Sequence, residues 1–336
     1  MKKILTVTLV VVVLFTLSFV FMAQKKKEEA VGKPKFGAAQ FAPEDGYKFA
    51  VVTVSTAVAY WVPVAQGMRD AAAMIGCKAE HLGPPDYKPE EVIAIMENLL
   101  ESGIDGASLF VTEPGIFDMV IEKYMKAGIP LIIMPGGYDD AERYGLAYIG
   151  QHNYSAGVQW GERIAKILGP NPKGKEVIFV TEVPGQNTLE LRMDGAKEIL
   201  DKYGVKYKVL DGTTDREKSY AVIENAYRAN PKISGIFSPD TTGTPAAGLF
   251  VKNNNLQGKV LVGGFDLVPD ALQGIKEGYI DHVIDQYPYL QGYLVIHQLY
   301  LKKTLGLEPF THYIPANFVT KENVDMAIEL SQKGFR

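Results

Sequence analysis

The feature that most constrains the fold of this chain is an alternation of short apolar runs with longer amphipathic segments, which occurs twice. The first series begins with Tyr47–Ser55, a short run rich in β-branched residues that is typical of a strand buried on both faces. In the second series Glu176–Thr181 corresponds to Phe49–Val54, and equivalent strands lie roughly 125–135 residues apart, much farther than in a solenoid. Alternating strands and helices predict a parallel sheet covered by helices. We therefore expect an α/β protein with two similar lobes, each a doubly wound parallel sheet.

The individual elements follow from the same pattern. Strands are predicted over Tyr47–Ser55, Lys78–Leu82, Gly106–Val111, Ile129–Met134 and Leu146–Ile149, and again over Glu176–Thr181, Tyr207–Leu210, Gly235–Ser238, Val260–Gly263 and Val283–Asp285. Helices are predicted over Pro63–Ile75, Glu90–Glu101, Gly115–Ala127, Thr188–Tyr203, Glu217–Ala229 and Thr244–Asn253.

Further segments follow the second series, when both predicted sheets are already complete. They are an amphipathic helix at Pro288–Leu305, an extended piece at His312–Val319 and a helix at Glu322–Ser331. We expect them to cross back between the lobes, so that 47–151 with 287–312 form one lobe and 152–286 with 313–336 the other. Several such crossings make a hinge that allows closure around a ligand. Because ligands of such sheets sit beyond the carboxyl ends of the strands, the site is expected between the lobes.

The beginning of the chain indicates export. Lys2 and Lys3 precede Ile4–Ala23, a run without any charge. Residues 1–23 are therefore predicted to be a secretory signal peptide or, since about 20 apolar residues span a bilayer, a retained N-terminal anchor. Residues 24–46 are charged and rich in Gly, Pro and Ala, which is typical of a flexible linker. The protein is expected in the periplasm or on the outer face of the cytoplasmic membrane.

Composition and motifs exclude several classes of function. The net charge is −4, so no basic face for nucleic acid is expected. No Gly-rich nucleotide-binding motif, nucleophile elbow or zinc-protease motif is present. The single cysteine, Cys77, excludes an internal disulfide and a multi-thiolate metal site, and the five histidines are scattered along the chain. We expect neither an enzyme nor a protein with a cofactor or metal.

Candidate binding residues of the first lobe follow its strands. Ser55 ends the first strand, and Tyr60 and Trp61 come shortly after it. These adjacent aromatic residues are either core residues or a stacking wall for the apolar face of a ligand. Gly136 belongs to a bare turn after the fourth strand, where backbone can approach a ligand closely.

Candidate binding residues of the second lobe are mostly polar. Gln186, Asn187 and Glu190 follow the first strand of this lobe, and Asn187 can alternatively cap the next helix. Three further polar residues follow successive strands of the same lobe: Asp240, Asp266 and Gln286. Each aspartate can also serve as a helix cap. Acids and amides below an aromatic wall are good acceptors for hydroxyl groups, which favours a small polyol as the ligand.

From Tyr47 to about Val324 the chain resembles the ribose-type periplasmic sugar-binding proteins, the solute-binding components of ABC importers. The resemblance is carried by the order and spacing of several short motifs: VST at Val54–Thr56, the pair Tyr60-Trp61, GIPLIIM at Gly128–Met134, IGQHN at Ile149–Asn153, GGFD at Gly263–Asp266 and IDQYP around Gln286. The stretch Phe237–Gly248 is more similar to the autoinducer-2 and rhamnose branch of this family.

The resemblance implies a type I periplasmic binding protein fold. It implies that Tyr60, Trp61, Asp240, Asp266 and Gln286 face a sugar. It also places Asn153, as a further ligand-binding residue, near a hinge crossing at His152–Asn153, with the other crossings near Gln286 and Tyr313–Ala316. The implied partner is the membrane permease of an ABC importer. The alternative is a sensor that presents its ligand to a chemoreceptor or sensor kinase. A monomer is expected.

Two departures from the family pattern concern the charge of the site. Pro135-Gly136 stands where the family often has Asp-Arg, and Glu190 stands where it often has Arg. We therefore expect a strongly acidic site that binds a neutral monosaccharide or polyol, with an amine-bearing ligand as the alternative.

Overall fold

The computed structural model describes residues 37–58, 60–86 and 88–336. The chain divides into two units, Met1–Ala42 and Pro43–Arg336. In the first unit Gly37–Phe41 forms a short 3-10 helix, η1. The predicted signal peptide or anchor at 1–23 and the linker as far as residue 36 lie outside the described residues. Within the described ranges, no helix combines the length and the apolar character required to traverse a bilayer.

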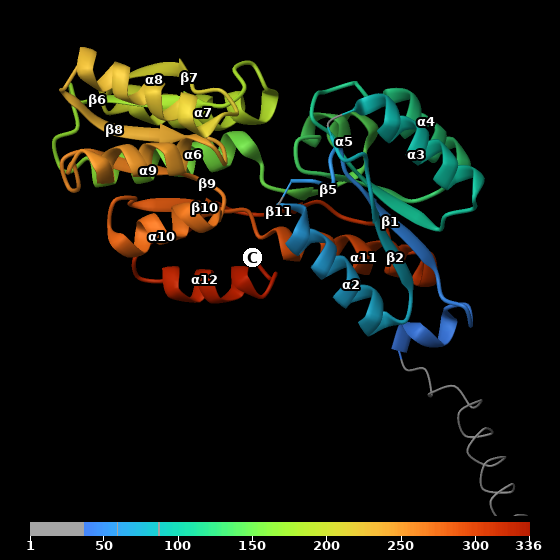
Figure 1. Cartoon of the computed structure of the whole chain (residues 1–336). Helices are drawn as coiled ribbons and strands as arrows, with labels where there is room; N and C mark the ends of the chain where they lie inside the picture. Colours follow the sequence, from blue (N-terminus) through green and yellow to red (C-terminus); the bar gives the residue numbers. More distant parts are fainter. Residues whose placement is uncertain (1–36, 59, 87) are drawn as a thin grey trace, which may run out of the picture. The chain divides into compact units, whose positions relative to one another are not determined.

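The described residues of Pro43–Arg336 form two six-stranded sheets with equivalent strand orders (Figure 1). The first sheet has the order β11 (His312–Tyr313), β5 (Ala147–Gly150), β4 (Leu131–Met134), β3 (Gly106–Phe110), β1 (Lys48–Val52), β2 (Lys78–Leu82). The second has the order β12 (Asn317–Val319), β10 (His282–Asp285), β9 (Leu261–Phe265), β8 (Ile233–Ser238), β6 (Glu176–Thr181), β7 (Lys206–Asp211). Neighbouring strands are parallel except β10 and β12. The predicted pair of doubly wound parallel-sheet lobes is confirmed.

Helices cover both faces of the first sheet. Buried residues of α3 (Pro89–Glu101), α4 (Asp118–Ala127) and α5 (Tyr138–Tyr144) form one core with the strands. On the other face lie α2 (Trp61–Ile75) and α11 (Pro288–Leu305), whose backbones are in direct contact. A Cβ placed on Gly67 of α2 would lie 2.0 Å from the carbonyl oxygen of Tyr289, so only glycine permits this approach. The distant segment α11 is thereby fixed to the first lobe.

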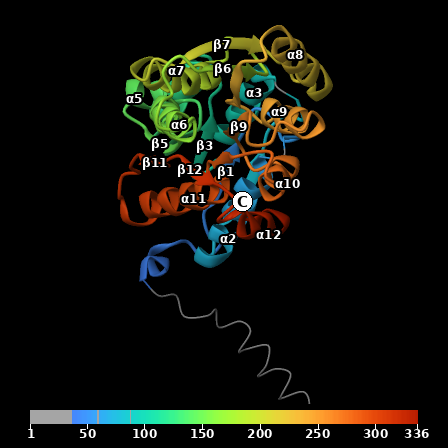
Figure 2. The ribbon, with the colours of Figure 1, turned by 90° about the vertical axis from the view of Figure 1, so that its left-hand side faces the viewer.

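The second sheet is covered in the same way (Figure 2). One face packs against α8 (Arg216–Ala229), α9 (Gly243–Asn253), α10 (Pro269–Glu277) and α12 (Val324–Gln332). The opposite face packs against α6 (Asn153–Ile167) and α7 (Asn187–Lys202), around the buried ring of Trp160. Helix α7 begins directly after the loop that follows β6, which places its first turn at the carboxyl edge of the sheet.

Some elements differ from the sequence prediction. Helices α5, α6 and α10 were not predicted, although Ala156, Trp160 and Ile164 of α6 form a clear apolar stripe. The extended piece predicted at His312–Val319 forms two short strands, β11 in the first sheet and β12 in the second. Pro315 lies in the interruption, and proline has no N–H to donate to a sheet ladder.

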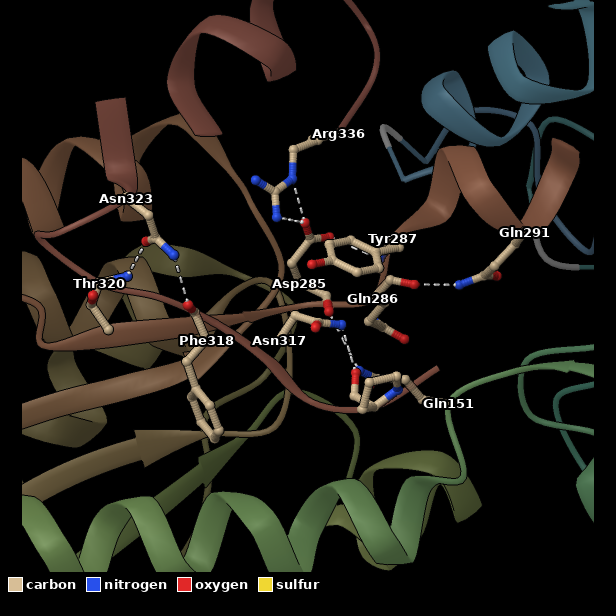
Figure 3. A network of polar contacts seen from close by, with 11 residues as sticks. Gln151, Asp285, Gln286, Tyr287, Gln291, Asn317, Phe318, Thr320, Asn323 and Arg336 are labelled. Atoms are coloured by element: carbon tan, nitrogen blue, oxygen red, sulfur yellow. Dashed lines mark hydrogen bonds and ion pairs between the residues drawn. The ribbon is translucent and has the colours of Figure 1, made fainter. Parts of the chain in front are cut away.

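The chain passes between the lobes at 150–153, 285–288 and 313–317, and Gln151 connects these crossings. Its side-chain amide donates to the carbonyl oxygen of Pro315 at 3.0 Å and to that of Asp285 at 3.4 Å. Gln151 is 1% exposed, so these bonds are shielded from water (Figure 3). The crossings thus form one connected hinge next to the carboxyl edges of both sheets.

Candidate functional site

The carboxyl edge of the second sheet gathers charged and amide side chains from several strands. Glu182 follows β6, Asp240 lies just beyond β8, Asp266 follows β9 and Gln286 follows β10. Because these strands are parallel, their carboxyl ends lie along one edge, which is where ligands of open α/β sheets bind.

Arg192, on the buried face of α7, is the centre of this group. Its guanidinium donates through Nε to Oδ1 of Asn153 (3.1 Å), through Nη1 to the carbonyl oxygen of Pro239 (2.9 Å) and through Nη2 to Oε1 of Gln286 (2.8 Å). It also lies 4.2 Å from the centre of the Phe265 ring. Arg192 is only 4% exposed, and its burial lowers the pKa of the guanidinium. A buried charge requires such partners, so Arg192 orders the side chains around it.

Gln286 links Arg192 to Asp266. Its Oε1 accepts the bond from Arg192, while its Nε2 donates to Oδ1 of Asp266 at 2.6 Å. Burial raises the pKa of Asp266, and Arg192 and Gln286 act in the opposite direction. Oδ1 of Asp266 is thereby held in place by Gln286, and the residue lines the cavity described below.

The backbone of Asp266 supports this orientation. Its φ is +71°, a left-handed conformation that is uncommon for a residue with a side chain. Its N–H donates to the carbonyl oxygen of Ile284 at 2.9 Å, which joins the ends of β9 and β10. Such strain persists only where the surroundings enforce it, and it is concentrated at binding sites.

Asp266 and Gln286 line a cavity of about 210 Å³ between the lobes. The first lobe contributes Val58, Tyr60 and Pro63, and the hinge and second lobe contribute Thr241, Asp266, Leu267, Val268, Pro269, Asp285, Gln286, Pro288 and Arg336. Pockets for drug-sized molecules usually occupy about 300–1,000 Å³. This cavity therefore suits a small ligand, and it combines apolar walls with two carboxylates, an amide and a guanidinium.

Tyr60 is connected to the same group through Gln291. Nε2 of Gln291 donates to the hydroxyl oxygen of Tyr60 (2.8 Å) and to the carbonyl oxygen of Gln286 (2.7 Å). Gln291 is fully buried in α11, whereas Tyr60 is half-buried. Figure 3 shows the Gln291–Gln286 bond beside the hinge. Gln291 thus fixes the position of the Tyr60 ring relative to Gln286.

Trp61 lies behind Tyr60. Its ring packs edge-on against Phe110 and against Tyr60, each with 4.9 Å between ring centres. Trp61 is 4% exposed. Of the two alternatives for this aromatic pair, the structure gives Trp61 a core environment and leaves the ring of Tyr60 at the cavity.

Asp240 is occupied by backbone donors at the start of α9. Its Oδ1 accepts from the N–H groups of Thr242 (3.1 Å) and Gly243 (2.8 Å), and its Oδ2 accepts from the N–H of Glu182 (2.7 Å). It is 2% exposed and does not line the cavity. The geometry therefore corresponds to the capping alternative.

Glu182 lies beside Asp240 and was not singled out from the sequence. It accepts a hydrogen bond from the hydroxyl of Thr242 at 2.6 Å. Burial, reinforced by the charges of Asp240 and Asp266, raises the pKa of Glu182 to about 7. Glu182 therefore keeps its proton to a higher pH than an exposed glutamate does.

The remaining predicted residues lie around the cavity rather than in it. The Ser55 hydroxyl donates to the carbonyl oxygen of Pro85 at 2.6 Å, and Oε1 of Glu190 accepts from the N–H of Gly185 at 2.9 Å. Gln186 and Asn187 stand at the start of α7. Gly136 has φ +92°, and a Cβ there would lie 3.5 Å from the hydroxyl of Thr188 in the other lobe. Asn153 joins the group through its bond to Arg192.

Arg192 also corrects the expectation of a strongly acidic site, because a buried cation lies opposite the carboxylates. The signal for it is present in the sequence. Leu189, Met193 and Ala196 form an apolar stripe on α7, and Arg192 is a charge on the same face. Gln291, on the buried face of α11, carries the same kind of signal.

Two α/β lobes with a small polar and aromatic cavity beside a shared hinge define a binding protein of the two-lobed type. The family model described as "Periplasmic binding protein domain" matches residues 49–304, and the chain belongs to this family. Its relatives carry the names of binding proteins rather than enzymes.

Several relatives are similar over most of the chain. The xylose/arabinose-binding protein of Sulfolobus acidocaldarius is 27% identical over 307 residues, which cover 87% of this chain and 75% of the relative. The D-allose-binding periplasmic protein of Escherichia coli is 25% identical over 72% of this chain and 79% of its own. Among solved structures, an ABC transporter solute-binding protein of Burkholderia graminis in complex with D-arabinose is 28% identical, with a TM-score of 0.73 over 82% of this chain and 96% of its own.

Proposed function

We propose that this protein captures a neutral monosaccharide or related polyol in the cavity between its lobes and delivers it to the permease of an ABC importer. The proposal rests on the hydrogen-bonded row in which Arg192 contacts Gln286 and Gln286 contacts Asp266. Gln286 and Asp266 line the same cavity as Tyr60. A carboxylate at the cavity wall, such as that of Asp266, accepts hydrogen bonds from sugar hydroxyls, and such charge-assisted bonds are strong. The Tyr60 ring supplies an apolar surface for the C–H face of a sugar.

The charge distribution supports a neutral ligand. Arg192 lies buried next to Asp266 and partly offsets its charge. The carboxylates Asp266 and Asp285 in the cavity lining disfavour an anion, while the guanidinium of Arg336 in the same lining disfavours an ammonium group. The names of the relatives, which refer to xylose, arabinose, allose and ribose, agree with a neutral pentose or hexose and favour transport over sensing.

Calorimetric titration tests the proposal directly. The panel contains D-xylose, D-arabinose, D-ribose, D-allose and myo-inositol, with D-glucuronate and D-glucosamine as charged comparators. We expect binding of at least one neutral compound, and a loss of about 10- to 100-fold in affinity in Asp266→Asn, because a charged hydrogen-bond acceptor is removed. Asp325→Asn, at an aspartate whose side chain is 78% exposed, is the matched control and should bind normally. A preference for a charged sugar, or unchanged binding in Asp266→Asn, would contradict the proposal.

We further propose that the protein is exported, with residues 1–23 acting as a cleaved signal or retained anchor, and that it acts as a monomer. The apolar run Ile4–Ala23 after Lys2 and Lys3 supports export.

Mass spectrometry of the N-terminus in the extracytoplasmic and membrane fractions distinguishes cleavage from retention. Deletion of the gene for this protein should abolish uptake of the bound sugar by the cell. If uptake stays intact but the cells are no longer attracted to the sugar, the partner is a chemoreceptor.

A further inference from the structure

The segment that follows α12 packs against the hinge. Arg336 contacts Asp285 at the end of β10, with Nε and Nη2 lying 2.7 Å and 2.6 Å from Oδ2 (Figure 3). The Asp285 side chain is 1% exposed and that of Arg336 12% exposed, so the pair is largely desolvated. A guanidinium that engages a buried carboxylate through two nitrogen atoms fixes direction as well as distance.

Asp285 in turn holds the hinge turn that contains Gln286. Its Oδ1 accepts a hydrogen bond from the N–H of Tyr287 at 2.8 Å. Tyr287 has φ +48° and ψ +56°, a left-handed conformation that costs energy for a residue with a side chain. The Arg336 guanidinium also lies 5.2 Å from the centre of the Tyr287 ring. Asp285 and Tyr287 are thus both held by Arg336, and Gln286 lies between them.

The same segment reaches the first lobe. The ring of Phe335 lies 5.3 Å from that of Tyr289, in the first turn of α11. The Tyr289 hydroxyl donates to Oδ2 of Asp70 on α2 at 2.9 Å. Residues 333–336 therefore extend from α12 of the second lobe to a helix pair of the first lobe across the hinge.

We propose that Arg336 is a positioning residue for ligand binding. Through Asp285 it fixes the strained turn at Tyr287 and so directs the side chain of Gln286 toward Asp266 and the cavity. This inference deepens the proposed function, and the part of it that concerns sugar affinity rests on that function. Because Arg336 also lines the cavity, its effect on the hinge turn is measured without ligand, where a direct contact with the sugar plays no part. Without Arg336, Asp285 loses its cation, the turn at Tyr287 relaxes, and the row Arg192, Gln286 and Asp266 loses its alignment.

The first test needs no ligand. Hydrogen–deuterium exchange is measured on the unliganded full chain with Arg336→Gln, and Arg216→Gln serves as a control because Arg216 pairs with Asp270 on the surface. We expect exchange in peptides covering 285–289 to be about tenfold faster in Arg336→Gln, with strands β1, β3 and β6 unchanged. No change at 285–289, or an equal increase throughout the second lobe, would overturn the inference.

The second test measures affinity with D-arabinose as the probe, or with whichever panel sugar the wild-type protein binds. Arg336→Gln and Asp285→Asn should each weaken binding about tenfold. The double variant should be no weaker than either single variant, because both substitutions remove the same pair. Arg336→Lys should recover part of the loss, since it restores the charge. Additive losses, or full affinity in Arg336→Gln, would contradict a role through Asp285.

The exchange and affinity measurements distinguish a failure of this inference from a failure of the proposed function. Absence of binding to every panel sugar in the wild-type protein would refute the proposed function, while the exchange measurement would still decide whether Arg336 holds the turn. If Asp285→Asn does not fold, the affinities of Arg336→Gln and Arg336→Lys decide whether Arg336 contributes to binding.

Discussion

Nη2 of Arg192 donates a hydrogen bond to Oε1 of Gln286 at 2.8 Å, and the two side chains are 4% and 6% exposed. This bond decides which end of the Gln286 amide faces Asp266. A guanidinium has only donors, so the reverse orientation would set the amide NH₂ against other N–H groups. With Oε1 bound to Arg192, Nε2 is directed to Asp266 at 2.6 Å. A residue on α7 thereby sets the hydrogen-bonding character of the cavity edge.

Arg192→Lys should weaken both folding and binding. The partners Asn153, Pro239 and Gln286 are contacted by three different guanidinium nitrogens, which one ammonium group cannot replace. We expect the free energy of unfolding to fall by about 2–4 kcal/mol and the affinity for the bound sugar to fall about tenfold. Urea unfolding followed by circular dichroism and calorimetric titration measure the two effects. Arg228→Lys, at a side chain 70% exposed, is the control. Wild-type stability in Arg192→Lys would contradict the view that the Arg192 guanidinium orders the side chains around it.

Much of the architecture was predictable from sequence, because it depends on local patterns. Short β-branched runs and amphipathic segments locate the strands and most helices, and their duplication predicts two similar lobes. Helix α11, over Pro288–Leu305, was predicted with its observed bounds. A crossing within His312–Val319 was expected near Tyr313–Ala316. The strand partners were not, because pairing of β11 with β5 and of β12 with β10 depends on tertiary position rather than on local sequence.

The site was harder to predict, since polar residues at strand ends have two physical uses. Asp240 and Asp266 look alike in sequence, yet Asp240 accepts backbone N–H groups while Asp266 lines the cavity. What separates them is the backbone around each residue, including the left-handed φ of Asp266. Arg336 lies 51 positions from Asp285, so no local spacing relates the two.

Glu182 should contribute less to stability as the pH rises from about 5 to 8. Its pKa is raised to about 7 by burial and by the charges of Asp240 and Asp266. Between the usual carboxyl pKa of about 4.3 and about 7, the folded protein therefore binds a proton that the unfolded chain releases. This contribution favours folding less and less across that range. The melting temperature of the wild-type protein minus that of Glu182→Gln, recorded from pH 5 to 8, should decrease across this range, because the other titrating groups, including the buried His282, are common to both proteins. Glu322→Gln, at an exposed glutamate, should show the same pH dependence as the wild-type protein. A pH dependence of Glu182→Gln identical to that of the wild-type protein would contradict a contribution from Glu182.

Tyr60 should contribute to binding mainly through its ring. Tyr60→Phe removes the hydroxyl that lies 2.8 Å from Nε2 of Gln291, but that nitrogen keeps its bond to the Gln286 carbonyl oxygen. We expect Tyr60→Phe to weaken sugar affinity by only about three- to tenfold. Tyr60→Ala also removes the apolar wall and should weaken affinity further. Tyr203→Phe, at a residue 51% exposed in the second lobe, controls for loss of a tyrosine hydroxyl. Equal affinities for Tyr60→Phe and Tyr60→Ala would argue against a stacking role for the ring.

Gly136→Ala should be far more destabilising than an alanine substitution at another left-handed glycine. Gly136 has φ +92°, and a Cβ there would lie 1.9 Å from the carbonyl oxygen of Val111. Gly258 has φ +72° but nothing within 4 Å of the added Cβ, so Gly258→Ala reports the backbone cost alone. We expect that cost to be about 1–2 kcal/mol. Gly136→Ala should lose more than about 3 kcal/mol, because the turn after β4 must also move away from Val111. Urea unfolding of both variants measures the difference. Similar losses at the two positions would show that the turn at Gly136 can move away from Val111 at little cost.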